Sequence, residues 1–150
     1  MKAYPPRYCR AFSHHITLAS PPQTSEEIKY LHDHGIRKFY LIDLPLTTEL
    51  RQAGVAYKLE LRQWNLAAIL KVTTNMDDLA REILNERDKG SNVAILGAQQ
   101  DLGVICAALA LKSGSLELPW AIRKVVDISG PEALTNATLM ALDNFDKHIH

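Results

Sequence analysis

The stretch NVAILGAQQDLGVICAALAL, residues 92–111, decides the expected fold of this chain. Its residues Val93 to Leu96 form a short apolar run, which is typical of a strand in the middle of a sheet. The next segment, Gly97 to Gly103, has glycine at both ends, and the run from Val104 to Leu111 is apolar throughout. A helix that is apolar on all sides is normally buried. The stretch therefore predicts a central strand, a loop and a helix that is buried beside a sheet.

Helical and strand-like patterns alternate before this stretch. Thr24-Ser25-Glu26-Glu27 has the spacing of a capping box, which marks a helix start, and Gly35 is expected to end that helix. The expected elements before residue 92 are, in chain order, a strand at 12–18, a helix at 24–35, a strand at 36–42, a helix at 48–53 closed by Gly54, a strand at 55–61, and a helix with an apolar face at 76–84 that Gly90 closes.

After residue 111 the apolar spacing predicts helices alone, at 118–126 and 134–145, with Pro131 at a first helical position. Strands that alternate with helices are typical of α/β folds. We therefore expect one domain over residues 1–150, with an irregular arm at 1–11 and a body at 12–147. Its predicted fold is a three-layer α/β structure, with a mainly parallel central sheet of four to five strands and helices on both faces.

The composition narrows the expected partners. The chain has 150 residues, with 17 Lys and Arg against 17 Asp and Glu, and a zero net charge does not favour nucleic acid. The most apolar run is too short to cross a bilayer, and the N-terminus lacks the pattern of a secretory signal. These two features, together with the presence of only two cysteines, predict a cytoplasmic protein without a membrane partner.

The order of these pieces resembles the cysteine-dependent tyrosine and dual-specificity phosphatases, especially their small bacterial members. The segments that carry the resemblance are PPQTSEEIKYLHDHGIRKFYLIDL (21–44), AGVAYKLEL (53–61), NVAILGAQQDLGVICAALAL (92–111) and PWAIRKVVDISGPEALTN (119–136). The resemblance covers roughly residues 13–145, most of the chain, and implies a dual-specificity-phosphatase-like fold.

The resemblance also implies a catalytic apparatus that this chain lacks. In the family a strand ends in His-Cys, five residues follow, and an Arg opens the helix; here Leu96, Gly97 and Gly103 take those places. No arginine occurs between positions 87 and 123. The family's general acid, an Asp after the strand that matches 55–61, has no counterpart because residues 62–76 contain no carboxylate. The expectation is a pseudophosphatase with no catalytic residue.

The remnant loop and a neighbouring segment are the candidate binding residues. The loop candidates are Gly97, Ala98, Gln99, Gln100, Asp101, Leu102 and Gly103, and the pocket-rim candidates are Gln63, Trp64 and Asn65. Backbone N–H groups at a helix start favour an anion, but Asp101 is expected to cap them itself, which leaves Gln99 and Gln100 for a neutral polar ligand. If the loop is a decayed phosphate loop, Gly97→Cys, Asp101→Gly and Gly103→Arg together should restore oxyanion binding.

The other reactive side chains favour ordinary roles. Cys106 lies in the apolar run and is expected in the core, whereas Cys9, near two arginines, is expected to be exposed. The six histidines do not have ligand spacing, so no metal and no cofactor is expected. The preferred function is a non-catalytic binding or regulatory module for an unknown protein or small molecule. The alternatives are a hydrolase with replaced catalytic residues and a structural protein that forms homo-oligomers.

Overall fold

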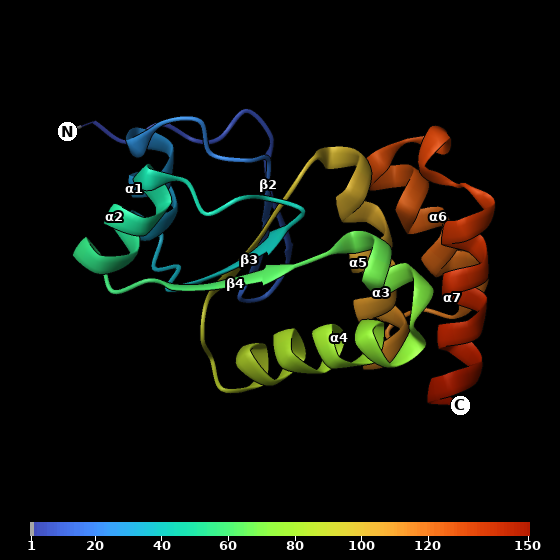
Figure 1. Cartoon of the computed structure of the whole chain (residues 1–150). Helices are drawn as coiled ribbons and strands as arrows, with labels where there is room; N and C mark the ends of the chain where they lie inside the picture. Colours follow the sequence, from blue (N-terminus) through green and yellow to red (C-terminus); the bar gives the residue numbers. More distant parts are fainter. Residues whose placement is uncertain (1) are drawn as a thin grey trace. The chain divides into compact units, whose positions relative to one another are not determined.

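The computed structural model describes residues 2–150 and confirms an α/β fold with a five-stranded, mainly parallel sheet (Figure 1). The elements are β1 (Cys9–Ser13), β2 (Ile16–Ala19), α1 (Ser25–Asp33), β3 (Lys38–Ile42), α2 (Thr48–Ala56), β4 (Glu60–Trp64), α3 (Leu66–Lys71), α4 (Thr73–Asp88), β5 (Val93–Leu96), α5 (Gln99–Ser113), α6 (Leu118–Ser129), the 3₁₀ helix η1 (Pro131–Ala133) and α7 (Asn136–Ile149). They form two compact units, one with residues up to 64 and 86–98, the other with 65–85 and 99–150.

The first unit contains the whole sheet, in the order β1-β2-β5-β3-β4. β1 pairs with β2 in the antiparallel sense, and every other pair is parallel. β5 lies in the middle between β2 and β3, and all four of its residues are fully buried. A strand buried on both faces shows a continuous apolar run instead of alternation, which explains the sequence pattern of β5. The prediction of a central strand at 93–96 is confirmed.

Helices α1 and α2 pack on one face of this sheet. Alternate residues of β3 and β5, among them Phe39, Leu41 and Leu96, share a core with Ile28 of α1 and Leu50 of α2. The residues that alternate with them in β3 and β5 are also buried. Two buried faces require apolar side chains in both phases of each strand, and the sequence of β3, KFYLI, meets this requirement.

The expected capping box of α1 is present. Thr24 Oγ1 accepts from the backbone N–H of Glu27 at 3.3 Å, and the Glu27 carboxylate accepts from the N–H of Thr24 at 2.9 Å. A cap of this kind stabilises a helix by about 1 kcal/mol. After the helix, Gly35 has a φ of 84°, the left-handed conformation that ends many helices. The predicted start and end of this helix are confirmed.

Two expected strands differ from the structure. The single strand expected at 12–18 is wrong: a hairpin of β1 and β2 turns at His14 and His15, so part of the expected irregular arm belongs to the sheet. Residue 1 of that arm lies outside the described residues. The strand expected at 55–61 begins only at Glu60, because α2 continues through Gly54 and ends where Lys58 adopts a φ of 55°.

The second unit is helical. Residues 102–111 of α5 are all buried, which confirms the buried helix, and that helix packs closely against α6. It starts at Gln99, however, so the loop expected at 97–103 is wrong from Gln99 onward. α6 and α7 run to Ser129 and Ile149, a few residues beyond the expected ends, and Pro131 opens η1. Helix α3, capped by the side chain of Asn65, was not expected from the sequence.

The structure places both cysteines away from an activated environment. Cys106 is fully buried in α5, as expected. Cys9 is half-buried in β1, not exposed, and burial raises the pKa of its thiol above the ordinary value of 9.0. Since the thiolate is the reactive form, neither cysteine has the setting of a nucleophile. No helix among residues 2–150 is long and apolar enough to cross a membrane.

Thiol labelling checks this placement. In native protein we expect a reagent such as a maleimide to modify Cys9 slowly and to leave Cys106 unmodified, because only Cys9 is partly accessible. Mass spectrometry before and after unfolding in urea should show one modification and then two. Equal native rates at the two cysteines would contradict the burial of α5.

Candidate functional site

The N-terminal turn of α5 is built around the hydroxyl group of Ser129, the last residue of α6. Ser129 Oγ accepts a hydrogen bond from the backbone N–H of Gly103 at 2.8 Å and donates one to the carbonyl oxygen of Gln99 at 2.6 Å. Gln99 and Gly103 are four residues apart, the spacing that closes one α-helical turn. The hydroxyl therefore bridges the two backbone groups of that turn, and the N–H of Gly103 is engaged within the protein.

Gly103 lies directly against α6. A Cβ atom at this position would be 2.5 Å from Ser129 Oγ, 2.9 Å from the carbonyl oxygen of Val125 and 3.0 Å from Val125 Cα. Two of these three atoms belong to the backbone, so rotation of a side chain cannot relieve the contact. The φ of Gly103 is not in the left-handed region, so its backbone conformation does not require glycine. Glycine is required here because the two helices pack too closely for a side chain.

Gln99 contributes a third contact between the same helices. Its side-chain Nε2 donates to the carbonyl oxygen of Ile128 at 2.9 Å. The expectation that Gln99 meets a neutral ligand is therefore not supported by its geometry, because its amide group caps a carbonyl near the end of α6. The end of α6 was missed at the sequence level, although Ser129-Gly130-Pro131 is a helix-end signal that could have placed the hydroxyl there.

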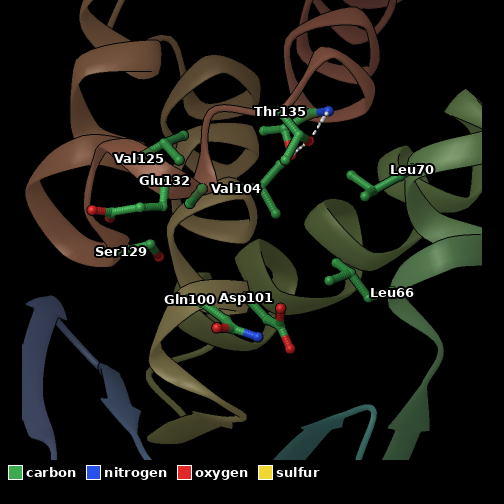
Figure 2. A pocket seen from close by; sticks show the side chains of 11 residues that line it. Leu66, Leu70, Gln100, Asp101, Val104, Val125, Ser129, Glu132 and Thr135 are labelled. Carbon is green, nitrogen blue, oxygen red and sulfur yellow. Dashed lines mark hydrogen bonds between the residues drawn. The ribbon is translucent and has the colours of Figure 1, made fainter.

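A cavity of about 510 Å³ lies beside this turn (Figure 2). Its walls come from α3, α5, α6, η1 and the start of α7. The lining residues are Leu66, Leu70, Gln100, Asp101, Val104, Val125, Ser129, Glu132, Ala133, Thr135 and Thr138. Figure 2 shows Gln100 and Asp101 on α5, with Leu66 and Leu70 extending into the cavity from α3. This size is within the usual range for pockets that hold small molecules.

The structure separates the loop candidates by role. Gln100 and Asp101 line the cavity, and Leu102 is buried in the core. Gly97 and Ala98 precede α5, and the backbone N–H of Gly97 donates to the carbonyl oxygen of Ala19 at 3.1 Å. Of the seven candidates, two therefore face the cavity of the second unit.

The three rim candidates have local roles. Gln63 Nε2 donates to the carbonyl oxygen of Leu44 at 3.0 Å, which ties β4 to the segment after β3. Trp64 is half-buried, and among residues 2–150 its indole N–H has no hydrogen-bond partner. Asn65 Oδ1 accepts from the N–H of Ala68 at 2.9 Å and so caps the helix that supplies Leu66 and Leu70 to the cavity.

A buried carboxylate in the same unit was missed at the sequence level. Asp77 Oδ1 lies 2.7 Å from Lys112 Nζ, while its Oδ2 lies 3.4 Å from Arg81 and 3.8 Å from His148. Burial raises the pKa of Asp77, but the hydrogen bond from Lys112 and the three cationic neighbours outweigh it and hold the pKa below its ordinary value of 3.8. Asp77 is therefore a carboxylate at neutral pH.

The histidines are distributed over separate local contacts. His15 Nδ1 lies 2.6 Å from Asn92 Oδ1, and the rings of His32 and Tyr57 stack at 4.3 Å. Within residues 2–150 there is no group of three or more His, Cys, Asp or Glu side chains that could hold a metal ion.

Comparison with known proteins identifies the fold. No family model and no curated protein matches the chain. Among solved structures, PTPMT1 matches with a TM-score of 0.73 and 16% identity over 95% of this chain and 96% of that chain. The core catalytic domain of the PP-IP phosphatase SIW14 from S. cerevisiae, in complex with citrate, matches with a TM-score of 0.76 and 13% identity, covering 97% and 90%. The chain has the fold of the dual-specificity phosphatases.

A third solved structure with a similar fold is a substituted phosphatase. The kinase associated phosphatase KAP, with its catalytic-site cysteine substituted by serine, matches with a TM-score of 0.72 and 12% identity over 99% of this chain and 97% of that chain. Identities this low establish the phosphatase fold, while the chemistry depends on individual side chains. In the present phosphatase-fold chain, Gly97 follows the central strand and Gly103 lies in the first turns of the next helix.

Proposed function

We propose that this chain is a non-catalytic binding module with a phosphatase fold, a pseudophosphatase, that takes its ligand in the cavity beside the first turn of α5. The observation that carries the proposal is the contact of Gly103 with α6. The resemblance puts the phosphate-binding arginine at this position, and here even a Cβ atom would lie 2.5 Å from Ser129 Oγ and 2.9 Å from the carbonyl oxygen of Val125.

The nucleophile position supports the same conclusion. Gly97 occupies the place that the resemblance assigns to cysteine, and the nearest cysteine along the chain, Cys106, is fully buried in α5. A thiol that is buried away from solvent is not accessible to attack a phosphorus atom. Loss of a covalent nucleophile typically lowers kcat by about six orders of magnitude.

The leaving-group acid has no replacement either. Asp77 is the first carboxylate after residue 62, and its lowered pKa leaves no proton on it at neutral pH. A general acid needs a pKa near the pH at which the enzyme works, so that it carries the proton before the bond breaks. Asp77 stabilises the helical unit through ion pairs instead of donating a proton.

The proposal is tested with p-nitrophenyl phosphate and a phosphotyrosine peptide as substrates. We expect release of p-nitrophenol and phosphate at the rate of a buffer blank, because nucleophile, arginine and acid are all missing. The variants Cys9→Ala, Cys106→Ala and Asp77→Asn serve as controls for an unrecognised catalytic group. Turnover that elutes with the folded protein and is lost in any of these variants would falsify the non-catalytic proposal.

A further inference from the structure

Another cavity lies on α6, away from the candidate site. It has a volume of about 270 Å³, and its lining residues are Leu116, Trp120, Arg123, Lys124 and Asp127. One helical turn holds 3.6 residues, so Trp120 and Arg123 lie on the side of α6 opposite Val125 and Ser129, which line the cavity beside α5. Trp120 is 57% exposed. A single exposed apolar residue is common, but this one forms the wall of a cavity that also contains charged side chains.

Trp120 also contacts the guanidinium group of Arg123. The guanidinium carbon of Arg123 lies over the Trp120 ring, 5.7 Å from its centre, within the range of a cation–π contact. An arginine has five N–H donors, more than a contact with one ring can use. The same group can therefore bind a carboxylate through two parallel hydrogen bonds while it stays over the ring.

We propose that this cavity is a docking site for a peptide segment of a partner protein that carries an Asp or Glu side chain next to an apolar side chain. The carboxylate binds Arg123, and the apolar side chain packs on Trp120 and Leu116. Pockets that hold small molecules usually have roughly 300–1,000 Å³, and this cavity is smaller, which suits a side chain of a peptide. The inference goes beyond the proposed function of the cavity beside α5 and does not depend on it.

The charges of the lining favour an acidic occupant. Arg123 and Lys124 are cationic, and Asp127 is the one carboxylate among the five lining residues. Lys124 Nζ lies 3.8 Å from Asp127 Oδ2, so these two side chains offset each other in part. Two cations against one carboxylate leave the lining with a net positive charge, however Asp127 divides its contacts. A carboxylate of a partner complements this charge.

An anionic bilayer fits this face less well than a peptide does. Recognition of anionic lipid usually requires clusters of about four to eight Lys and Arg side chains, and the cavity has two. Glu117, directly before α6, and Asp127 are both exposed and present negative charge on the same stretch. A broad anionic surface would meet these carboxylates together with Arg123, whereas a peptide side chain can contact Arg123 alone.

The test uses three acetylated and amidated pentapeptides, GEFEG, GQFQG and GKFKG, with the full chain. Binding is followed by backbone amide chemical shifts and by the indole N–H signal of Trp120. We expect GEFEG to shift the signals of residues 116–127 and to bind about two- to fivefold more tightly than GQFQG, the usual effect of an exposed ion pair. Salt should reduce this preference, and GKFKG should bind most weakly.

Two substitutions assign the effect to the proposed residues. Arg123→Gln should abolish the preference for GEFEG over GQFQG, because the charge that distinguishes the two peptides is removed. Trp120→Ala should weaken binding of both peptides by about threefold or more, because the aromatic wall is lost. Arg87→Gln is the control, since Arg87 is paired with Asp88 outside the cavity, and it should leave both affinities unchanged. Circular dichroism checks that each variant is folded.

Several results would overturn the inference. Equal binding of the three peptides, shifts confined to residues outside 116–127, or no shift at millimolar peptide would each do so. Sedimentation with phosphatidylserine vesicles and light scattering test the other occupants: vesicle binding or dimer formation that Trp120→Ala abolishes, without binding of GEFEG, would replace the peptide. These comparisons use the unaltered chain first, so they hold even if a variant does not fold. Hydrolysis of p-nitrophenyl phosphate would overturn the proposed function and leave this inference intact.

Discussion

Gly103→Arg is expected to prevent stable folding, with a loss of about 4 kcal/mol or more in the free energy of unfolding. The reason is steric: the first side-chain carbon would already overlap Ser129 Oγ and the backbone of Val125. Gly103→Ala introduces that carbon alone and should cost about 1–3 kcal/mol, the usual range for an overpacked core. Urea denaturation followed by circular dichroism gives both values.

A second glycine in a helix provides the matched control. At Gly54 in α2, a Cβ atom would meet Leu61 Cδ1 at 3.3 Å, and the side chain of Leu61 can move aside. Gly54→Ala is therefore expected to change stability by less than about 1 kcal/mol, with alanine favoured by its helix propensity. If Gly103→Ala were as stable as Gly54→Ala, α5 and α6 would not be in the close contact described here, and the argument against an arginine at 103 would fall.

The same contact corrects an expectation from the sequence. Restoring the phosphatase pattern with Gly97→Cys, Asp101→Gly and Gly103→Arg was expected to recover oxyanion binding. The structure predicts instead that the triple variant unfolds before it can bind, because the space for the guanidinium group is filled by α6. The packing of α6 against Gly103 therefore adds a steric obstacle to the absence of an arginine at this position.

Asp77→Ala is expected to lower the free energy of unfolding by about 1–3 kcal/mol at neutral pH. The side chain is only 12% exposed, and its removal leaves Lys112 without the partner at 2.7 Å. Lys112 itself is 30% exposed, so water offsets part of the loss, which is why the expected cost stays below that of a fully buried pair. Urea denaturation at about pH 7 measures the difference.

The neighbouring Asp78 is the control, because it lies in the same helix, α4, but on the solvent-exposed surface. Asp78 is 51% exposed and contacts Arg81 on the surface, so Asp78→Ala should cost less than about 1 kcal/mol. Comparable losses at the two positions would show that Asp77 has no special role in the unit.

The pH dependence of the Asp77 contribution follows from the direction of its pKa. The pKa of Asp77 is lower in the folded chain than its ordinary value of 3.8, so its contribution is complete above that value and disappears as the pH falls through the folded pKa. The difference between the unaltered chain and Asp77→Ala should therefore shrink between about pH 4 and the acid limit. A difference that persists unchanged in acid would mean that packing, not charge, is responsible.

Several elements could be predicted from the sequence because their causes are local or periodic. The capping box at Thr24 and Glu27 depends on residues three apart, and the continuous apolar runs of β5 and α5 depend on burial on all sides. The absence of arginine between positions 87 and 123, and of a carboxylate in residues 62–76, is likewise visible in the sequence, because it does not depend on the alignment register. These features were sufficient to predict the α/β class and the resemblance to phosphatases.

Only the tertiary structure shows which backbone groups at the start of α5 already have hydrogen-bond partners within the protein. The sequence does not show that Ser129 bridges Gln99 and Gly103, since the contact joins residues 26 or more positions apart. It also does not show that α2 passes through Gly54, because a glycine ends a helix only where the chain takes the left-handed conformation, and here Lys58 takes it. Close packing of α5 on α6 places Ser129 Oγ and the Val125 backbone against Gly103 and engages the Gly103 N–H, and such packing is a property of two helices together.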